Sequence, residues 1–196
     1  MNLRVKGKLV VGLTGNIASG KSTALAYFAK NGAEVISADA LVHKLYQTAD
    51  VQKKMKHLFG STQPEVIAQA IFEKPEARKR VEKILHPLVL KIAAEQIKKS
   101  PHRFFVFEVP LLFEVQWNKL TDLNIVVWGG EKNLKARLKE RNISAAEYKR
   151  RIKAQMPDSQ KACLADVLLV NNGTKKDLGL KVKRLCRAFE YIYSLN

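Results

Sequence analysis

Short runs of continuous apolar residues alternate along the chain with longer stretches in which apolar positions recur every three or four residues. A short apolar run bounded by polar residues or glycine is typical of a strand buried on both faces. Five such runs predict strands at residues 9–13, 33–36, 104–107, 123–128 and 166–170. Because these runs alternate with helical stretches, the pattern predicts an α/β fold with a five-stranded parallel sheet, flanked by helices and joined by right-handed crossovers.

Helical spacing fills most of the chain between the predicted strands, and helices are expected at residues 22–30, 40–47 and 174–195. Residues 50–99 are almost wholly helical in pattern and predict an inserted helical subdomain. Within it, His86-Pro87 predicts a helix that begins at Leu88, with the proline in its first turn. Residues 131–162 are polar, basic and poor in apolar positions. This composition favours a helical segment that packs over a site rather than within the core.

The size and charge of the chain narrow its function only partly. A chain of 196 residues suits one domain with insertions, and its 35 Lys and Arg against 18 Asp and Glu leave a net charge of +17. Such a charge attracts phosphates, nucleic acid or anionic lipid without choosing among them. The basic residues are spread without interleaved aromatic residues or a recognition motif, which disfavours nucleic acid as the partner. No obligate protein partner is indicated.

The compartment is predicted from the apolar runs and the cysteines. No segment approaches the ~18 continuous apolar residues of a membrane span, and the N-terminal residues fit a signal peptide poorly. Cys163 and Cys186 lie far from metal-type spacing, each within an apolar helical pattern. They predict two buried thiols in a reducing compartment. We therefore expect a cytoplasmic protein.

Residues 15–22, Gly-Asn-Ile-Ala-Ser-Gly-Lys-Ser, fit the phosphate-loop pattern G-x-x-x-x-G-K-[ST], and they follow a predicted strand and open a predicted helix. Backbone amides of such a loop surround a β-phosphate at the positive end of the helix. Gly15 and Gly20 permit backbone conformations and close approaches that a Cβ would block. Lys21 is expected to bridge the β- and γ-phosphates of ATP, and the Ser22 hydroxyl to ligate Mg²⁺. Thr23 or the loop amides are expected at the α-phosphate.

Residues outside the loop must bind the phosphoryl acceptor. Asp39 follows the second predicted strand, so it could be the base that deprotonates an attacking hydroxyl or a cap of the following helix, and spacing alone does not decide. His86 could contact a ligand or serve structure alone, and the residues favour the structural role. Arg137, Arg141 and the pair at 150–151 suit bidentate phosphate grips. At least one of these arginines is predicted to close over the transferring phosphate as part of a lid.

Taken together, these segments resemble the dephospho-coenzyme A kinase family over nearly the whole chain. The resemblance is carried by the phosphate loop at residues 12–23, by Ser37-Ala38-Asp39 and by the His-Pro segment at residues 81–89. Residues 108–114, 137–141, 151–155, 165–166 and 171–173 follow in the order of the family. It implies a P-loop kinase that phosphorylates the ribose 3′-hydroxyl of dephospho-coenzyme A with ATP and Mg²⁺, the last step of coenzyme A synthesis. It also implies one domain made of a core (about 1–48, 101–130 and 163–196), a helical coenzyme-binding insertion (about 49–100) and a helical lid (about 131–162). The alternatives are another small-molecule or nucleoside monophosphate kinase with the same core and, as a different class, a nucleic-acid-binding P-loop protein.

The resemblance also assigns roles by position. It implies that Asp39 is the catalytic base, assisted by Lys21 and Arg141. The nucleotide would be bound by the loop (Gly15, Ala18, Ser19, Gly20, Lys21, Ser22, Thr23), by Arg137, and by Asn172 near the adenine, and the acceptor by His86, Pro87, Pro110, Leu111, Leu112 and Glu114. The chain departs from the family pattern at several positions: Asn16 and Ala18 replace loop glycines, Ser37 replaces an acid, Glu108 stands where Asp is common, and Pro64 lacks a nearby Arg.

Overall fold

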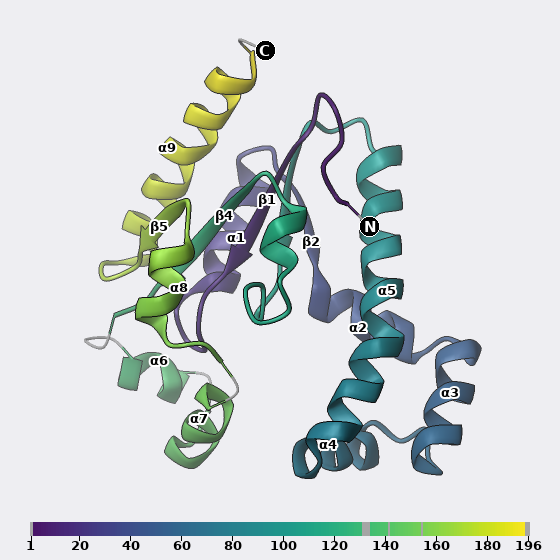
Figure 1. The fold of residues 1–196 in the computed structure, drawn as a ribbon. Coiled ribbons are helices and arrows are strands. Elements are labelled where there is room, and N and C mark those ends of the chain that lie inside the picture. Colours follow the sequence, from purple (N-terminus) through teal and green to yellow (C-terminus); the bar gives the residue numbers. More distant parts are fainter. Residues whose placement is uncertain (1, 131–133, 141, 154, 195–196) are drawn as a thin grey trace. The chain divides into compact units, whose positions relative to one another are not determined.

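The computed structural model describes residues 2–130, 134–140, 142–153 and 155–194 (Figure 1). The chain divides into a helical unit, residues 37–99, and a sheet unit, residues 2–36 with 100–194.

The sheet unit contains the parallel sheet that the apolar runs predict. Its strands lie in the order β2-β3-β1-β4-β5, and the pairs of β1 with β3, β1 with β4, and β4 with β5 are parallel. The bounds of the strands are β1 Leu9–Thr14, β2 Glu34–Ser37, β3 Phe104–Glu108, β4 Leu123–Trp128 and β5 Val167–Val170. Each predicted strand is therefore confirmed to within a residue at either end. β1 at the centre is buried along its whole length, which explains its continuous apolar run.

Helices of the sheet unit cover this sheet and hold the core. Leu9, Val11 and Leu13 of β1 pack with apolar residues of α1 and α9, two helices that also contact each other. The bounds of the helices are α1 Lys21–Lys30, the 3-10 helix η1 Trp117–Leu120, α6 Leu134–Glu140, α7 Ala145–Ile152, α8 Asp158–Leu164 and α9 Lys175–Ser194. The predicted helical segment 131–162 is thus a series of short helices, α6, α7 and the start of α8.

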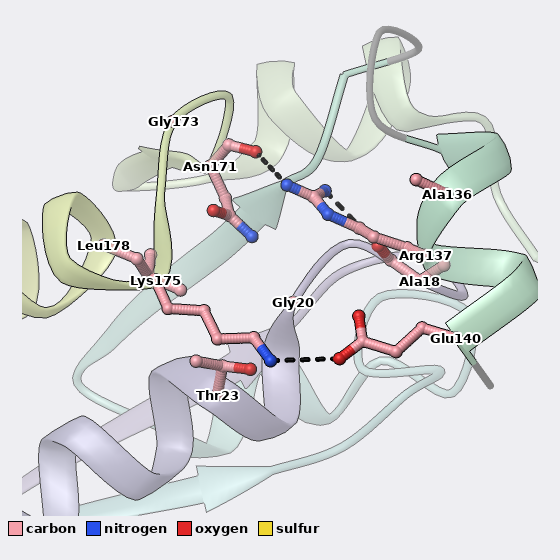
Figure 2. Close-up of a pocket in the computed structure, with 10 residues that line it drawn as sticks. All are labelled: Ala18, Gly20, Thr23, Ala136, Arg137, Glu140, Asn171, Gly173, Lys175 and Leu178. Atoms are coloured by element: carbon pink, nitrogen blue, oxygen red, sulfur yellow. Dashed lines mark hydrogen bonds and ion pairs between the residues drawn. The ribbon is translucent and has the colours of Figure 1, made fainter.

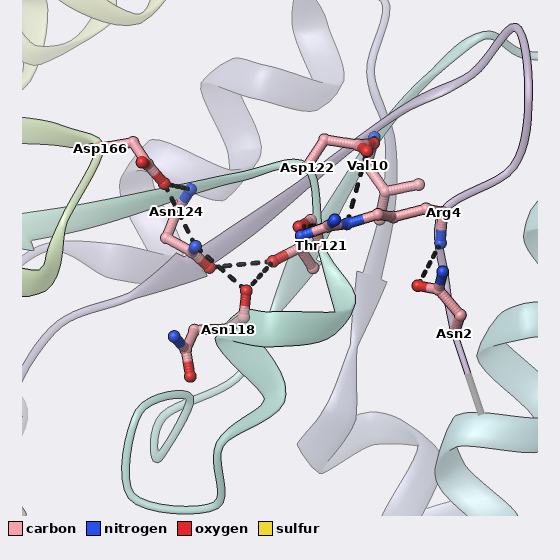
Figure 3. A network of polar contacts seen from close by, with 8 residues as sticks. All are labelled: Asn2, Arg4, Val10, Asn118, Thr121, Asp122, Asn124 and Asp166. Atoms are coloured by element: carbon pink, nitrogen blue, oxygen red, sulfur yellow. Dashed lines mark hydrogen bonds and ion pairs between the residues drawn. The ribbon is translucent and has the colours of Figure 1, made fainter.

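A polar network holds the amino-terminal ends of β1 and β4 (Figure 3). The Asp166 carboxylate accepts hydrogen bonds from the backbone and side-chain amides of Asn124, at 2.7 and 3.2 Å. The Thr121 hydroxyl donates to Asn124 Oδ1 at 2.9 Å, and the Asp122 carboxylate accepts from the Val10 amide at 2.8 Å. Asp166, a residue of the family pattern, therefore has a structural role in joining β4 to the start of β5.

The helical unit contains α2 Ala38–Tyr46, α3 Ala49–Phe59, α4 Pro64–Glu73 and α5 Pro75–Lys99. The prediction that a helix begins at Leu88 is wrong, because α5 continues through Pro87. Its buried positions recur every fourth residue along the helix, at Val81, Leu85, Val89, Ala93 and Ile97. Burial of this stripe keeps the helix continuous, and Pro87, which lacks an amide donor, is exposed on the opposite side.

The prediction of two buried thiols is half wrong. Cys186 on α9 is buried, but Cys163 on α8 is exposed. The apolar run Ala162-Cys163-Leu164 suggested a buried face, yet Leu164 is 52% exposed and Lys161 fully buried. The ion pair of Lys161 with Glu114 decides which side of this short helix faces inward. No described helix has the length and apolar content needed to cross a membrane.

Candidate functional site

The loop between β1 and α1 has the backbone conformation that its glycines were predicted to serve. Gly15 and Gly20 have φ values of +150° and +102°. A Cβ on Gly15 would lie 2.4 Å from the Val127 carbonyl oxygen, and one on Gly20 would lie 2.1 Å from Asn171 Nδ2. Glycine is therefore required at both positions for steric reasons. Ala18 also adopts a left-handed conformation, with φ +61°, at a cost of roughly 1–2 kcal/mol for a residue with a Cβ.

The amino terminus of α1 faces the loop with open backbone amides. Among the residues that the structure describes, no side chain caps this helix, whose N-cap is Gly20. The first amides of a helix without a cap remain available to an anion, and the helix dipole adds to their attraction. Ser22 is exposed in the first turn, and Thr23 beside it is half-buried. The loop and helix together form an anion site.

Lys21 is held against a carboxylate at the end of a neighbouring strand. Its Nζ lies 3.7 Å from Glu108 Oε1, and the two side chains are 14% and 12% exposed. Glu108 ends β3 in register with Leu13 of β1, so the parallel pairing itself brings the acid to the loop. Sequence reasoning assigned no role to Glu108. The signal was available, because an apolar strand that ends in an acid beside a phosphate loop places a carboxylate at the phosphates.

The donor set at this place suits Mg²⁺. Mg²⁺ binds hard oxygen ligands, commonly one or two carboxylates together with phosphate oxygens. The Glu108 carboxylate and the Ser22 hydroxyl are oxygen donors of this kind, on the two elements that meet at the loop. Within the described residues, no group of three or more His, Cys, Asp or Glu side chains could hold a metal by itself. The residues therefore fit a cation that shares its ligands with a bound phosphate.

A cavity of about 470 Å³ lies beside the loop (Figure 2). Arg137 crosses its rim from α6 and donates hydrogen bonds to three backbone carbonyl oxygens. Its guanidinium reaches Asn171 O at 2.7 Å, Gly129 O at 3.0 Å and Ala18 O at 3.4 Å. Lys175 and Glu140 pair across the same rim at 3.0 Å. The cavity is lined by residues of the loop, α1, α6, the connection between β5 and α9, and the start of α9: Ala18, Gly20, Thr23, Ala136, Arg137, Glu140, Asn171, Gly173, Lys175 and Leu178.

Asn171 is the buried polar centre of this cavity wall. Its Nδ2 donates to the Ser19 carbonyl oxygen at 2.8 Å, and its backbone amide donates to Trp128 O at 2.7 Å. The family resemblance pointed to the neighbouring Asn172, whose side chain is exposed, and no role was predicted for Asn171. Strand alternation could have separated the two, because Asn171 continues the inward side of β5 on which Leu169 is buried.

The segment from Pro110 to Glu114, predicted at the acceptor, is fixed by contacts within the sheet unit. The Pro110 carbonyl oxygen accepts hydrogen bonds from the Thr14 hydroxyl at 3.1 Å and from Lys161 Nζ at 3.2 Å. Glu114 Oε1 accepts from the Met156 amide at 2.7 Å and pairs with Lys161 Nζ at 3.0 Å. Leu111 is half-buried, whereas Leu112 is fully buried, so the Leu112 side chain supports the segment from beneath.

Three predicted site residues belong to the helical unit. Asp39 is exposed in the first turn of α2, and the Ser37 hydroxyl accepts the Ala40 amide at 3.4 Å. Ser37 is therefore the N-cap of α2, and Asp39 does not cap this helix. His86 is half-buried on α5 beside Pro87. The pKa of His86 lies below its usual value, mainly because of burial. The charge of Glu82 opposes this lowering, and the charge of Arg78 adds to it.

The predicted lid arginines are described only in part. Arg137 lies at the cavity rim, and Arg150 is exposed on α7. Arg141 lies outside the described residues, as does the side chain of Arg151.

Comparison with known proteins identifies relatives of this chain. The family profile described as dephospho-CoA kinase matches residues 9–177. The chain is 33% identical over 179 residues to the dephospho-CoA kinase of Acinetobacter baylyi, covering 86% of this chain and 92% of that protein. It is 32% identical over 187 residues to that of Fusobacterium nucleatum, covering 91% and 97%.

Solved structures share the fold of this chain. A Thermus thermophilus protein superposes with a TM-score of 0.83 at 29% identity, covering 92% of this chain and 97% of that one. Dephospho-CoA kinase from Campylobacter jejuni superposes with a TM-score of 0.60 at 24% identity, covering 93% and 97%. Shikimate kinase from Acinetobacter baumannii, at 14% identity and a TM-score of 0.52, shares the fold.

Proposed function

The chain belongs to the dephospho-CoA kinase family, and from this premise we propose how its described residues perform the reaction of that family. The enzyme phosphorylates dephospho-coenzyme A to coenzyme A, the last step of coenzyme A synthesis, with ATP as co-substrate. In this reaction the ribose 3′-hydroxyl oxygen forms a bond to the γ-phosphorus, the bond from that phosphorus to the β,γ-bridging oxygen breaks, and ADP leaves.

The observation that carries the proposal is the phosphate loop itself. Its two glycines occupy conformations that no other residue fits, its helix begins with open amides, and Lys21 is positioned by Glu108. Main-chain amides bind the polyphosphate without reorganising, and this preorganisation is the main source of catalysis in phosphoryl transfer. The adenosine part of ATP would occupy the cavity in Figure 2, which Arg137 and Asn171 line, with Thr23 toward the α-phosphate.

Ser22 and Glu108 would hold Mg²⁺, which would supply positive charge beside the polyphosphate when bound. Lys21 contributes a further positive charge to the phosphate oxygens. Before ATP binds, Glu108 holds the Lys21 ammonium in a half-buried position, so the lysine enters the complex with few conformations to lose.

Asp39 is proposed as the base that accepts the proton of the ribose 3′-hydroxyl. Its match to the family motif supports this role, and so does the finding that Ser37, not Asp39, caps α2. His86 and Pro87, and the segment from Pro110 to Glu114, are proposed at the acceptor on the same family match. Arg137 and Arg141 are proposed in the lid, which excludes water that would otherwise be phosphorylated in place of the acceptor.

We infer the cytoplasm as the compartment, because Cys163 and Cys186 are both free thiols. Kinases that act on other acceptors share this fold, so the substrate is tested against other acceptors.

An ADP-release assay with ATP, Mg²⁺ and dephospho-coenzyme A, run beside AMP, CMP and shikimate, tests the substrate. Turnover with dephospho-coenzyme A alone is expected, and turnover with another acceptor alone would refute the assignment.

Two variants with matched controls test the residue roles. Lys21→Met should lower kcat by about 10²–10³-fold, whereas Lys30→Met, at the exposed end of the same helix, should not. Asp39→Asn should lower kcat by about 10²–10⁴-fold with little change in ATP affinity. Asp50→Asn, at an exposed position on α3, is its control. Near-normal turnover by Asp39→Asn would remove Asp39 as the base.

A further inference from the structure

Gln155 and Met156, which follow α7, form hydrogen bonds with the phosphate loop. Gln155 Oε1 accepts a hydrogen bond from the Ile17 backbone amide at 3.2 Å. Asn16 Nδ2 donates to the Met156 carbonyl oxygen at 3.3 Å. The first half of the loop is thereby held by residues 138 and 140 positions away in the sequence.

A buried ion pair anchors this returning segment. The Met156 amide donates to Glu114 Oε1, and Lys161 Nζ pairs with the same oxygen at 3.0 Å. Lys161 is 0% exposed and also donates to the Pro110 carbonyl oxygen, which accepts the Thr14 hydroxyl as well. Since Thr14 immediately precedes Gly15, the segment is tied to the loop directly and through the strand that leads into it.

The buried Glu114–Lys161 pair fixes the positions of the groups around it more than it adds to the free energy of unfolding. A buried ion pair loses so much hydration that an apolar pair of similar volume is often as stable or more so. Its hydrogen bonds have fixed directions, however, and fix the main chain of Met156 and therefore the position of Gln155. The loop needs this support, because Asn16 to Ser19 lie outside both β1 and α1.

We propose that Gln155 is a positioning residue of the kinase. By accepting the Ile17 amide it fixes the first half of the phosphate loop, and the Glu114–Lys161 pair fixes Gln155 in turn. Amides that are already aimed bind the polyphosphate more tightly than amides that must first be ordered. Removal of the Gln155 acceptor therefore weakens nucleotide binding and leaves the fold intact. The inference rests on the proposed function only in taking the loop as the ATP site.

Gln155 can be replaced without disturbing the packing around it. Its side chain is half-buried and borders a second cavity of about 820 Å³, on the side of the loop lined by Asn16, Ile17 and Ser19. Methionine matches glutamine in length and flexibility but is a weak acceptor. Glutamate keeps an oxygen that can accept the Ile17 amide.

The direct test is amide hydrogen exchange at Ile17, measured by NMR in the free enzyme, together with the Kd of ATP from calorimetry. In Gln155→Met we expect exchange at Ile17 to rise and the Kd to increase, each about three- to tenfold, as for the loss of one net hydrogen bond. Gln155→Glu should restore the protection of Ile17. Gln160→Met, on the exposed side of α8, should match the wild type in both measurements.

Thermal unfolding separates positioning from a merely structural role. The midpoint of Gln155→Met is expected to stay close to that of the wild type. Unchanged exchange at Ile17, an unchanged Kd, or a lowered midpoint with faster exchange throughout the chain would each overturn the proposal. Failure of the proposed function is distinguishable, because it would appear as wild-type enzyme that binds ATP without phosphorylating dephospho-coenzyme A.

Discussion

Lys161 is the buried charge on which the structure makes its sharpest stability prediction. Its side chain is 0% exposed and its ammonium is paired with Glu114 at 3.0 Å. Lys161→Met keeps the apolar stem and removes the ammonium. Glu114 is then a carboxylate that keeps the Met156 amide as a donor but has lost its cation, and the Pro110 carbonyl keeps only the Thr14 hydroxyl of its two donors.

The size of the loss follows from what remains at Glu114. Removing one partner of a buried ion pair costs about 3–5 kcal/mol. Because Glu114 is 18% exposed and keeps one donor, we expect the lower end, about 3 kcal/mol in the free energy of unfolding. For a chain of this size that corresponds to a fall of about 6–12 °C in Tm. The Glu114→Gln/Lys161→Met variant buries no charge and its amide oxygen still accepts Met156, so it should recover about half of the loss.

The coupling between Glu114 and Lys161 is measured by urea unfolding of the wild type, Glu114→Gln, Lys161→Met and the double variant. Trp117 and Trp128 both lie in the sheet unit, so their fluorescence reports the unit that contains the pair. Loss of less than about 1 kcal/mol in Lys161→Met, or additive losses in the double variant, would refute the reasoning.

Three further predictions concern other groups. Burial raises the pKa of Cys186 to about 11, so iodoacetamide should label exposed Cys163 and spare Cys186 in the native protein, as peptide mass analysis can check. Burial raises the pKa of Asp158 above 3.8, against a smaller lowering by Lys161. The stability that protonated Asp158 contributes is lost as the pH rises through that raised pKa. Asparagine does not ionise, so the urea midpoint of Asp158→Asn relative to that of the wild type should rise as the pH rises from 3.8. Pro87→Ala restores an amide donor within α5 and should raise the free energy of unfolding by about 2 kcal/mol, measured by thermal scanning.

The three inner strands, β1, β3 and β4, could be predicted closely because burial on both faces leaves a direct mark on the sequence. A strand such as β1 must be apolar at every position, and few other elements produce so short a continuous run. The helices were harder to place, since their ends depend on local hydrogen bonds. Pro87 shows the limit: its restriction on the backbone was read correctly, but the buried stripe of α5 outweighs it.

The polar residues show a different limit. The phosphate loop could be found because its chemistry requires glycines at fixed spacing. Gln155 has no such spacing, because it acts on a segment distant in the sequence. Asn171 and Glu108 also act on distant segments, and only their places at the ends of strands mark them. Cys163 was misplaced for the same reason, since the burial of Lys161 by a partner 47 positions earlier sets the orientation of α8.

The departures from the family pattern in the loop acquire a physical meaning from this geometry. A glycine at position 16 could not make the bond that Asn16 Nδ2 makes to Met156, so the substitution adds a contact to the segment that carries Gln155. Ala18 works in the opposite direction, because its left-handed backbone is strained. A strained loop is more dependent on external support than a relaxed one. The hydrogen bond from Ile17 to Gln155, immediately beside Ala18, is therefore placed where this loop most needs to be held.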